Sequence, residues 1–203
     1  MSPPIGVLLA AGSSSRFGAN KLLQPLAGGE PMGVMAARHL LTAVSRGVAV
    51  VRPDDIELSA ALSELGYRVV ENQQPESGMG ESLAVAVTAS LDAGGGWLVA
   101  LGDMPWIKPQ TIVKVAERLA QGASMVAPVY KGERGHPVGF ASRWGERLVE
   151  LSGDRGARQV LIEYPNDLEL LPVDDPGILL DVDFPEQLSE AGFESLSGKE
   201  SRR

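Results

Sequence analysis

The chain contains no cysteine. Disulfides, thiolate zinc sites, iron–sulfur clusters and a cysteine nucleophile are therefore excluded. A bound metal ion must be held by oxygen ligands or by the two histidines. Oxygen ligands are the ones that magnesium prefers, so the composition favours magnesium over softer metals.

Long hydrophobic runs and an excess of basic charge are also missing. No stretch approaches the roughly 20 apolar residues of a membrane-spanning helix, and the first residues lack the basic-then-apolar order of a secretion signal. We therefore expect a cytoplasmic protein with no membrane contact. The formal net charge of -8 argues against nucleic-acid binding, which needs a basic surface. A small anionic substrate remains compatible, because local backbone N–H groups and a few Lys or Arg side chains can bind it.

What is present indicates one α/β domain. The 203 residues are 44% hydrophobic and 22% charged, which suits a single globular domain with a buried core. Short runs rich in Val, Ile and Leu alternate with segments of helical periodicity, a pattern typical of helices layered on a mostly parallel sheet. We expect strands at residues 5–10, 48–51, 68–71, 97–101, 124–129, 137–140 and 168–171.

Helices are expected at residues 31–43, 56–65, 81–93, 109–120, 143–151 and 157–164. Ser142 is placed to cap the fifth of them. The domain is expected to span residues 1–191. The remaining stretch, 192–203, is polar and has too little apolar surface to offset the entropy of ordering, so we expect a flexible tail.

The strongest local signal directly follows the first expected strand. Residues 9–18 read Leu-Ala-Ala-Gly-Ser-Ser-Ser-Arg-Phe-Gly, and Lys21 comes shortly after them. Loops that follow strands face the ligand side of an α/β sheet, and small residues let backbone N–H groups approach an anion. Arg16 and Lys21 would supply positive charge. The segment is neither a Rossmann fingerprint nor a Walker A loop, and glycines and serines alone are equally compatible with a solvated turn.

Acidic residues follow two apolar runs. Asp103 comes directly after the expected strand at 97–101, and Asp181 and Asp183 alternate after another apolar stretch, so that in extended backbone they point to the same side. Magnesium usually takes one or two protein carboxylates together with substrate phosphates. An Asp before Pro is also common in turns and helix caps, and this alternative applies to each position taken singly.

Three further segments are rich in glycine. Residues 77–83 read Ser-Gly-Met-Gly-Glu-Ser-Leu and open a helix, which suits either an anion or a simple cap. Residues 132–140 contain Arg134 and His136, suited to an anionic ligand, although a histidine there also caps turns. Residues 153–158 bring Arg155 and Arg158, and guanidinium groups suit phosphates as well as exposed ion pairs.

Taken in order from residue 5 to residue 188, these segments resemble the signatures of the MobA-like nucleotidyltransferase family. The Ala10-Ala11-Gly12 form is similar to the molybdenum cofactor cytidylyltransferase branch. The resemblance implies a three-layer α/β/α fold with a mostly parallel, Rossmann-like sheet of about seven strands and one antiparallel strand near residues 137–140. The second acidic segment departs from the family pattern, with Phe184 for the usual Thr and Gln187 for the usual Asp.

The activity that the resemblance implies is transfer of CMP from CTP to molybdopterin, with release of pyrophosphate and dependence on Mg²⁺ or Mn²⁺. A molybdoenzyme or its maturation chaperone would be the protein partner. The implied catalytic residues are Lys21, Arg16 and Asp103, and the implied metal ligands are Asp103 and Asp183. Nucleotide contacts are implied for Leu9, Ala10, Ala11, Gly12, Ser13, Lys21, Ser77, Gly78, Gly80 and Ser82. Acceptor contacts are implied for Arg134, His136, Arg155 and Arg158.

Three alternatives stay open. The enzyme could be a related guanylyltransferase, or a nucleotidyltransferase that acts on another phosphorylated acceptor. The second alternative is an NAD(P)H-dependent oxidoreductase of the same fold. The third is a protein that carries the cofactor and has no catalytic activity. The presence of Lys21, Asp103 and Asp183 favours nucleotidyl transfer over reduction, because hydride transfer needs none of them.

Overall fold

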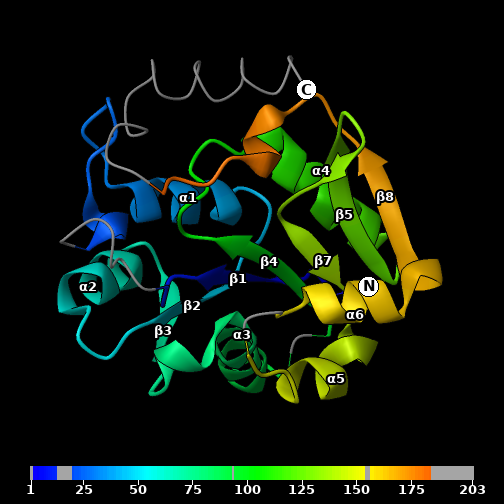
Figure 1. Ribbon diagram of the computed structural model, residues 1–203, viewed down its shortest axis with the longest axis horizontal. Coiled ribbons are helices and arrows are strands. Elements are labelled where there is room, and N and C mark those ends of the chain that lie inside the picture. Colours follow the sequence, from blue (N-terminus) through cyan, green and yellow to red (C-terminus); the bar gives the residue numbers. More distant parts are fainter. Residues whose placement is uncertain (1, 13–19, 93, 154–155, 184–203) are drawn as a thin grey trace.

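The computed structural model describes residues 2–12, 20–92, 94–153 and 156–183. An eight-stranded sheet forms its centre, with the order β3-β2-β1-β4-β7-β5-β6 and with β8 also paired to β5 (Figure 1). The strands are β1 Ile5–Leu9, β2 Gly47–Val51, β3 Tyr67–Glu71, β4 Trp97–Leu101, β5 Met125–Tyr130, β6 Glu133–Arg134, β7 Val138–Phe140 and β8 Leu168–Pro172.

The sheet is mostly parallel. Strands β1, β2, β3 and β4 run in one direction, β8 is parallel to β5, and β7 is antiparallel to both β4 and β5. This confirms the prediction of a mostly parallel sheet with an antiparallel strand near residues 137–140. The two-residue strand β6, antiparallel to the end of β5, was not predicted, because two residues are too few for a periodic pattern.

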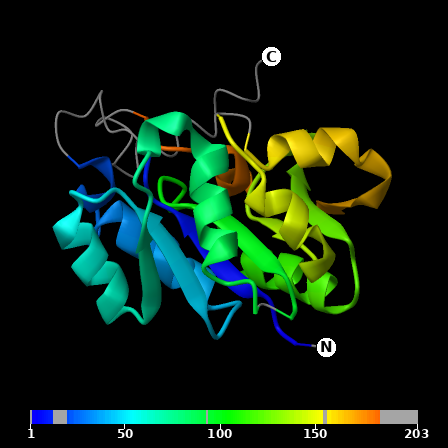
Figure 2. The ribbon, with the colours of Figure 1, turned by 90° about the horizontal axis from the view of Figure 1, so that it is seen from below.

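Helices cover both faces of the sheet, which confirms the three-layer prediction (Figures 1 and 2). Along β1, Val7 and Leu9 pack into one core and Leu8 into the other, as the twofold alternation of a strand requires. The first core also holds residues of α3, α5 and α6, and the second holds residues of α1, α2 and α4. The helices are α1 Met32–Leu41, α2 Ile56–Glu64, α3 Met79–Thr88, α4 Pro109–Ala120, α5 Gly145–Val149 and α6 Arg158–Glu163.

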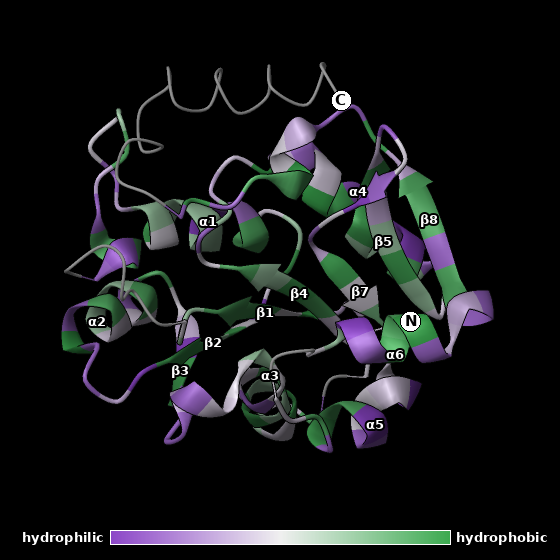
Figure 3. Cartoon of the chain, viewed as in Figure 1, coloured by the Kyte–Doolittle hydropathy of each residue, from purple (hydrophilic) through white to green (hydrophobic). Residues whose placement is uncertain are grey.

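Burial on both faces explains the sequence of the central strands. Figure 3 shows β1 and β4 as mainly hydrophobic, with hydrophilic residues on the outer helices and turns. Trp97, Leu98 and Val99 of β4 are each at most 2% exposed. Strands buried on both sides read as continuous apolar runs, and this is why β1 and β4 could be located from the sequence.

The predicted cap at Ser142 is wrong. Ser142 is the first residue of a short 3₁₀ turn, Ser142–Trp144, and its side chain makes no capping hydrogen bond. Helix α5 begins only at Gly145, after Trp144, and is not capped by a side chain. A serine inside the preceding turn lies too early to reach the free N–H groups of the helix.

Two further predictions concern the C-terminal residues and the lack of a membrane-spanning helix. The stretch predicted to be a flexible tail, residues 192–203, lies outside the described residues. Among the residues that the structure describes, no helix is long and apolar enough to cross a bilayer.

Candidate active site

The site forms where two neighbouring parallel strands end. Leu9 of β1 lies opposite Leu101 of β4, and the N–H of Gly102 donates to the carbonyl of Leu9 at 2.9 Å. The loops that follow β1 and β4 therefore leave the sheet side by side, at the edge where α/β proteins bind ligands. Lys21 and Asp103 meet there, with the Nζ of Lys21 3.0 Å from the Oδ2 of Asp103.

Lys21 is held in place by its neighbours. It begins the 3₁₀ turn Lys21–Leu23, which Asn20 caps by accepting a hydrogen bond from the N–H of Leu22 at 3.1 Å. The amide of Asn20 also donates to Asp55 at 2.7 Å, and Leu22 is buried beneath the turn. Only 12% of the Lys21 side chain is exposed, so its ammonium group is directed into the site. The sequence contained Asn20 beside Lys21 but gave no indication of this supporting contact.

A backbone contact brings the second acidic segment to the same place. The N–H of Val182 donates to the carbonyl of Asp103 at 3.0 Å, and the fully buried side chain of Val182 packs against Leu26 and Met32. Asp183 follows directly, with its Oδ1 3.5 Å from the Nζ of Lys21. Asp103 and Asp183 are 80 positions apart in the chain (183 minus 103). Both carboxylates thus contact the ammonium group of Lys21.

The local charge suits a divalent cation. Loss of solvent around the carboxyl group, together with the charges of Asp183 and Asp103, raises the pKa of Asp181. No cluster of three or more His, Asp or Glu side chains suited to a metal occurs within the described ranges. Two carboxylates completed by water and substrate phosphates form the donor set that Mg²⁺ ordinarily takes, and Mn²⁺ accepts the same oxygen ligands. Asp103 and Asp183 therefore fit such an ion.

A cavity of about 370 Å³ opens beside Lys21 and Asp103. The residues predicted to contact a nucleotide that line it are Leu9, Ala10, Ala11, Gly12, Lys21, Gly78 and Ser82. Pro75, Glu76 and Met79 also line it and were missed. Pro75 and Glu76 lie in a polar segment before the glycine-rich motif, where no residue pattern distinguished them from an ordinary loop.

Two predicted nucleotide contacts lie elsewhere. Ser77 is exposed, with its hydroxyl 3.4 Å from the side-chain oxygen of Gln74. The N–H of Gly80 donates to the carbonyl of Gly153, and a Cβ at Gly80 would lie 2.7 Å from the carbonyl oxygen of Ser152. Neither residue lines the cavity, and the close packing of α3 on this loop accounts for glycine at position 80. Ser13, Arg16 and Arg155 lie outside the described residues.

Comparison with known proteins shows which family the chain belongs to. The sequence profile described as the MobA-like NTP transferase domain matches residues 6–168, most of the chain. The chain belongs to the MobA-like NTP transferase family. It is therefore a member of a nucleotidyltransferase family, as the ordered motifs predicted.

Individual relatives of this MobA-like NTP transferase carry different names. Nicotine blue oxidoreductase of Paenarthrobacter nicotinovorans is 32% identical over 193 residues, covering 90% of this chain and 93% of the relative. Purine catabolism protein PucB of Bacillus subtilis is 29% identical over 196 residues, with the same coverage of both chains. The crystal structure of Rv0371c from Mycobacterium tuberculosis shares the fold, with a TM-score of 0.79, 24% identity and coverage of 98% and 100%, and that protein has also been solved with manganese.

A second cavity, of about 490 Å³, adjoins the first, since Leu9 and Met79 line both. Arg134, His136 and Arg158, three of the predicted acceptor contacts, line it. Burial and the nearby charge of Arg158 lower the pKa of Arg134. Among the described residues, neither arginine has an ion-pair partner. Two guanidinium groups that line one cavity without a paired carboxylate suit an anionic ligand.

His136 lines the same cavity and is close enough to Asp103 and Arg134 for both charges to act on its ring. Its backbone N–H donates to the carbonyl of Ile178 at 3.0 Å, which fixes the loop before β7. The Nδ1 atom is buried and has no hydrogen-bond partner among the described residues. Burial lowers the pKa of His136, while the charge of Asp103 and a backbone contact to Val99 act in the opposite direction. The imidazole is therefore neutral near pH 7 and has an unused ring nitrogen beside the second cavity.

Proposed function

We propose that this protein transfers CMP from CTP to the terminal phosphate of molybdopterin and releases pyrophosphate. One observation carries the proposal: Lys21 pairs with both Asp103 and Asp183, and Lys21 and Asp103 line a cavity that adjoins a second one at Leu9 and Met79. The cavity that contains Lys21 suits the nucleotide, and the cavity that contains Arg134 and Arg158 suits an anionic acceptor. The two ligands would then meet beside Lys21 and Asp103.

The chemistry requires positioning and charge neutralisation more than proton transfer. A phosphate monoester has a second pKa of about 6, so the acceptor phosphate is already a dianion near neutral pH and needs no general base. Its oxygen attacks the α-phosphorus of CTP, and the bond to the β-phosphate oxygen breaks to release pyrophosphate. Lys21 would neutralise charge on the phosphates while the backbone after β1 holds them. A Mg²⁺ or Mn²⁺ ion bound to Asp103 and Asp183 would supply further charge neutralisation.

Several contacts complete this proposal. Arg134, Arg158 and the neutral His136 would bind the acceptor, and Arg155 is included on the basis of the sequence motif. Arg16 and Ser13 are likewise assigned to the nucleotide phosphates from the motif. The manganese complex of the Mycobacterium tuberculosis relative supports a divalent cation in this fold.

The choice of CTP rests on Ala11. This residue is 3% exposed and lines the nucleotide cavity. A methyl group at that position narrows the space for a base, which favours a pyrimidine over a purine. Ala10-Ala11-Gly12 is also the form that resembles the cytidylyltransferase branch. A related guanylyltransferase, or an enzyme with another phosphorylated acceptor, is the alternative within this reaction class.

The 32% identity to nicotine blue oxidoreductase favours a second candidate, reduction of a small heterocycle by NAD(P)H. The cluster of Lys21, Asp103 and Asp183 argues against it, because hydride transfer requires neither a metal-binding carboxylate pair nor a lysine between them. A carrier of the cofactor would keep the second cavity and would catalyse no reaction.

An isotope experiment separates these candidates. CTP labelled at the α-phosphate is incubated with magnesium and molybdenum-loaded molybdopterin, and NADPH oxidation is followed in a parallel sample. Nucleotidyl transfer places the label on the cofactor and leaves NADPH unchanged. NADPH oxidation without label transfer would establish the oxidoreductase. The absence of both label transfer and NADPH oxidation would indicate a carrier.

Delivery of the product is the last part of the proposal. The dinucleotide cofactor is sensitive to oxidation, so transfer to a molybdoenzyme or to its maturation chaperone by direct contact would protect it. A pull-down with the whole chain from cells that make molybdoenzymes tests this, and recovery of no such partner would contradict it.

A further inference from the structure

Asn72 is a buried polar residue that the reaction described above does not use. It follows β3 directly and is 1% exposed. Its backbone N–H donates to the carbonyl of Val51 at 2.9 Å, which extends the pairing between β2 and β3 by one residue. A buried amide side chain must have its hydrogen-bonding groups satisfied, so its contacts indicate what it orients.

The orientation of the Asn72 amide is fixed by a backbone group. The N–H of Gln74 donates to Oδ1 of Asn72 at 2.8 Å. A backbone N–H can only donate, so the oxygen of the amide must face Gln74. The Nδ2 atom therefore faces Ser82, with its nitrogen 3.0 Å from the Oγ of Ser82.

This contact determines the polarity of the Ser82 hydroxyl. Because Nδ2 of Asn72 has no lone pair to accept a hydrogen bond, the hydroxyl must accept, and its own proton is left to point elsewhere. Within the described residues, Ser82 donates to no carbonyl. Its side chain lines the nucleotide cavity although the residue is only 5% exposed. Ser82 thus presents a hydrogen-bond donor to the cavity.

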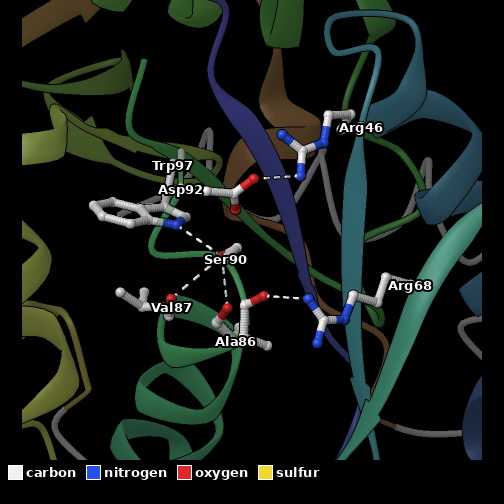
Figure 4. A network of polar contacts seen from close by, with 8 residues as sticks. Arg46, Arg68, Ala86, Val87, Ser90, Asp92 and Trp97 are labelled. Carbon is white, nitrogen blue, oxygen red and sulfur yellow. Dashed lines mark hydrogen bonds and ion pairs between the residues drawn. The ribbon is translucent and has the colours of Figure 1, made fainter. Parts of the chain in front are cut away.

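Another serine of the same region shows the opposite arrangement (Figure 4). The hydroxyl of Ser90, just beyond the end of α3, donates to the carbonyl of Ala86 at 2.7 Å and accepts from the indole of Trp97 at 2.9 Å. Its hydrogen-bonding capacity is therefore used within the protein. The free donor of Ser82 follows from the contact with Asn72 and is not a general property of serines in this region.

The position of Ser82 in the cavity indicates which part of a nucleotide it meets. The cavity is lined by residues at the ends of β1 and β4, among them Lys21 and Asp103, and by Pro75 and the start of α3, a helix that packs against β1 and β2. The phosphates belong with the lysine and the carboxylate of Asp103, which leaves the part of the lining that includes Ala11 and Ser82 for the base.

We propose that Asn72 is a positioning residue that fixes the Ser82 hydroxyl as a hydrogen-bond donor to an acceptor atom of the nucleobase. The inference rests on the proposed function for the presence of a nucleotide, and deepens it by assigning how the base is held. Cytosine offers its carbonyl oxygen and an unprotonated ring nitrogen as acceptors.

The test is a double-mutant cycle on the whole chain, with Kd for each of the four NTPs measured by calorimetry in magnesium. Asn72→Asp keeps the shape and still accepts from Gln74, but a carboxylate also accepts the proton of Ser82 and turns it out of the cavity. Ser82→Ala removes the hydroxyl. We expect each single variant to raise the Kd for CTP about three- to tenfold, which is the change in affinity expected from the loss of one hydrogen bond.

The cycle separates positioning from a general structural effect. In the Ser82→Ala background, Asn72→Asp should change the Kd by less than about twofold, since its effect passes through the hydroxyl. KM for CTP should rise while kcat is unchanged. Ser90→Ala, which removes a hydroxyl already paired within the protein, should leave the Kd unchanged.

Each outcome decides a different point. An unchanged Kd in Ser82→Ala overturns the inference even if Asn72→Asp fails to fold, and so does an effect of Asn72→Asp that persists without the hydroxyl. The same pattern with GTP in place of CTP supports the inference and corrects the base in the proposed function. Failure of the wild type to bind any NTP overturns both.

Discussion

The Nζ of Lys21 lies 3.0 Å from the Oδ2 of Asp103, and 82 positions separate the two residues in the chain. The contact exists because β1 and β4 are neighbours with the same direction, so the loops after them share one edge of the sheet. Asp183 joins them through the backbone of Val182. The proposed nucleotidyl transfer depends on this cluster.

Asp103→Asn should remove most of the activity. The substitution keeps the size of the side chain but takes away a negative charge that would hold the metal and orient Lys21. We expect kcat to fall about 100-fold or more, measured as pyrophosphate release at saturating substrates. Asp92→Asn is the matched control, because Asp92 pairs with Arg46 on the surface, away from the site, and its loss should leave kcat unchanged (Figure 4). Wild-type turnover in Asp103→Asn would refute the metal assignment.

Alanine at Gly80 and at Gly12 should have opposite consequences. A Cβ at Gly80 would lie within 3 Å of the Ser152 and Gly153 backbone, so Gly80→Ala should lower the free energy of unfolding by about 1–3 kcal/mol. At Gly12 no described atom lies within 4 Å of the new Cβ, so stability should be retained. Gly12 lines the cavity, and the added methyl should raise the Kd for CTP.

Urea denaturation and nucleotide titration of both variants provide the measurement. Loss of stability in Gly12→Ala, or a Kd change in a fully stable Gly80→Ala, would reverse the roles given to the two glycines.

The arginines of the second cavity should affect the acceptor and not the nucleotide. Arg158→Gln and Arg134→Gln remove charge-assisted hydrogen bonds, and we expect the KM for molybdopterin to rise about tenfold or more. The KM for CTP should stay the same. Arg143→Gln, at an exposed arginine that pairs with Asp167, is the control. A rise in the KM for CTP alone would exchange the roles of the two cavities.

His136 should make stability depend on pH in the acidic range. Burial lowers its pKa in the folded state below the ordinary value of 6.5, so below that pH the unfolded chain takes up a proton that the folded protein does not. Stability contributed in this way is present above about pH 6.5 and is lost as the pH falls, by up to about 1.4 kcal/mol per pH unit.

His136→Gln removes this titration. Urea denaturation from about pH 7.5 to about pH 5.5 should therefore show a steeper loss of stability in the wild type than in the variant. Parallel curves for the two proteins would mean that His136 titrates normally in the folded state.

The sequence was sufficient for the layers of the fold and for much of the candidate site. Buried parallel strands such as β4 leave a continuous apolar run, and an acidic residue at the end of such a run, Asp103, can be placed at the ligand edge without coordinates. The motifs likewise placed Gly12 and Arg134 in different parts of the site, and the structure puts them in different cavities.

The remainder depended on contacts between distant segments. Asn20 and Asn72 carry no distinguishing pattern, because an asparagine in a loop reads the same whether it supports a neighbour or faces solvent. Gly80 was assigned to the nucleotide although its partner is the backbone at residues 152–153, a contact created by tertiary packing alone. Ser142 failed as a cap because the length of the turn before α5 is not encoded by the residue type.

The most direct test of the central claim is pyrophosphate release from each of the four NTPs, with magnesium, in the presence and absence of molybdenum-loaded molybdopterin. Wild type and Asp103→Asn are compared under the same conditions. Release that requires the acceptor, occurs with CTP alone and disappears in Asp103→Asn is the predicted result. Acceptor-dependent release with GTP in place of CTP would contradict the assigned base, and no release with any NTP would contradict nucleotidyl transfer itself.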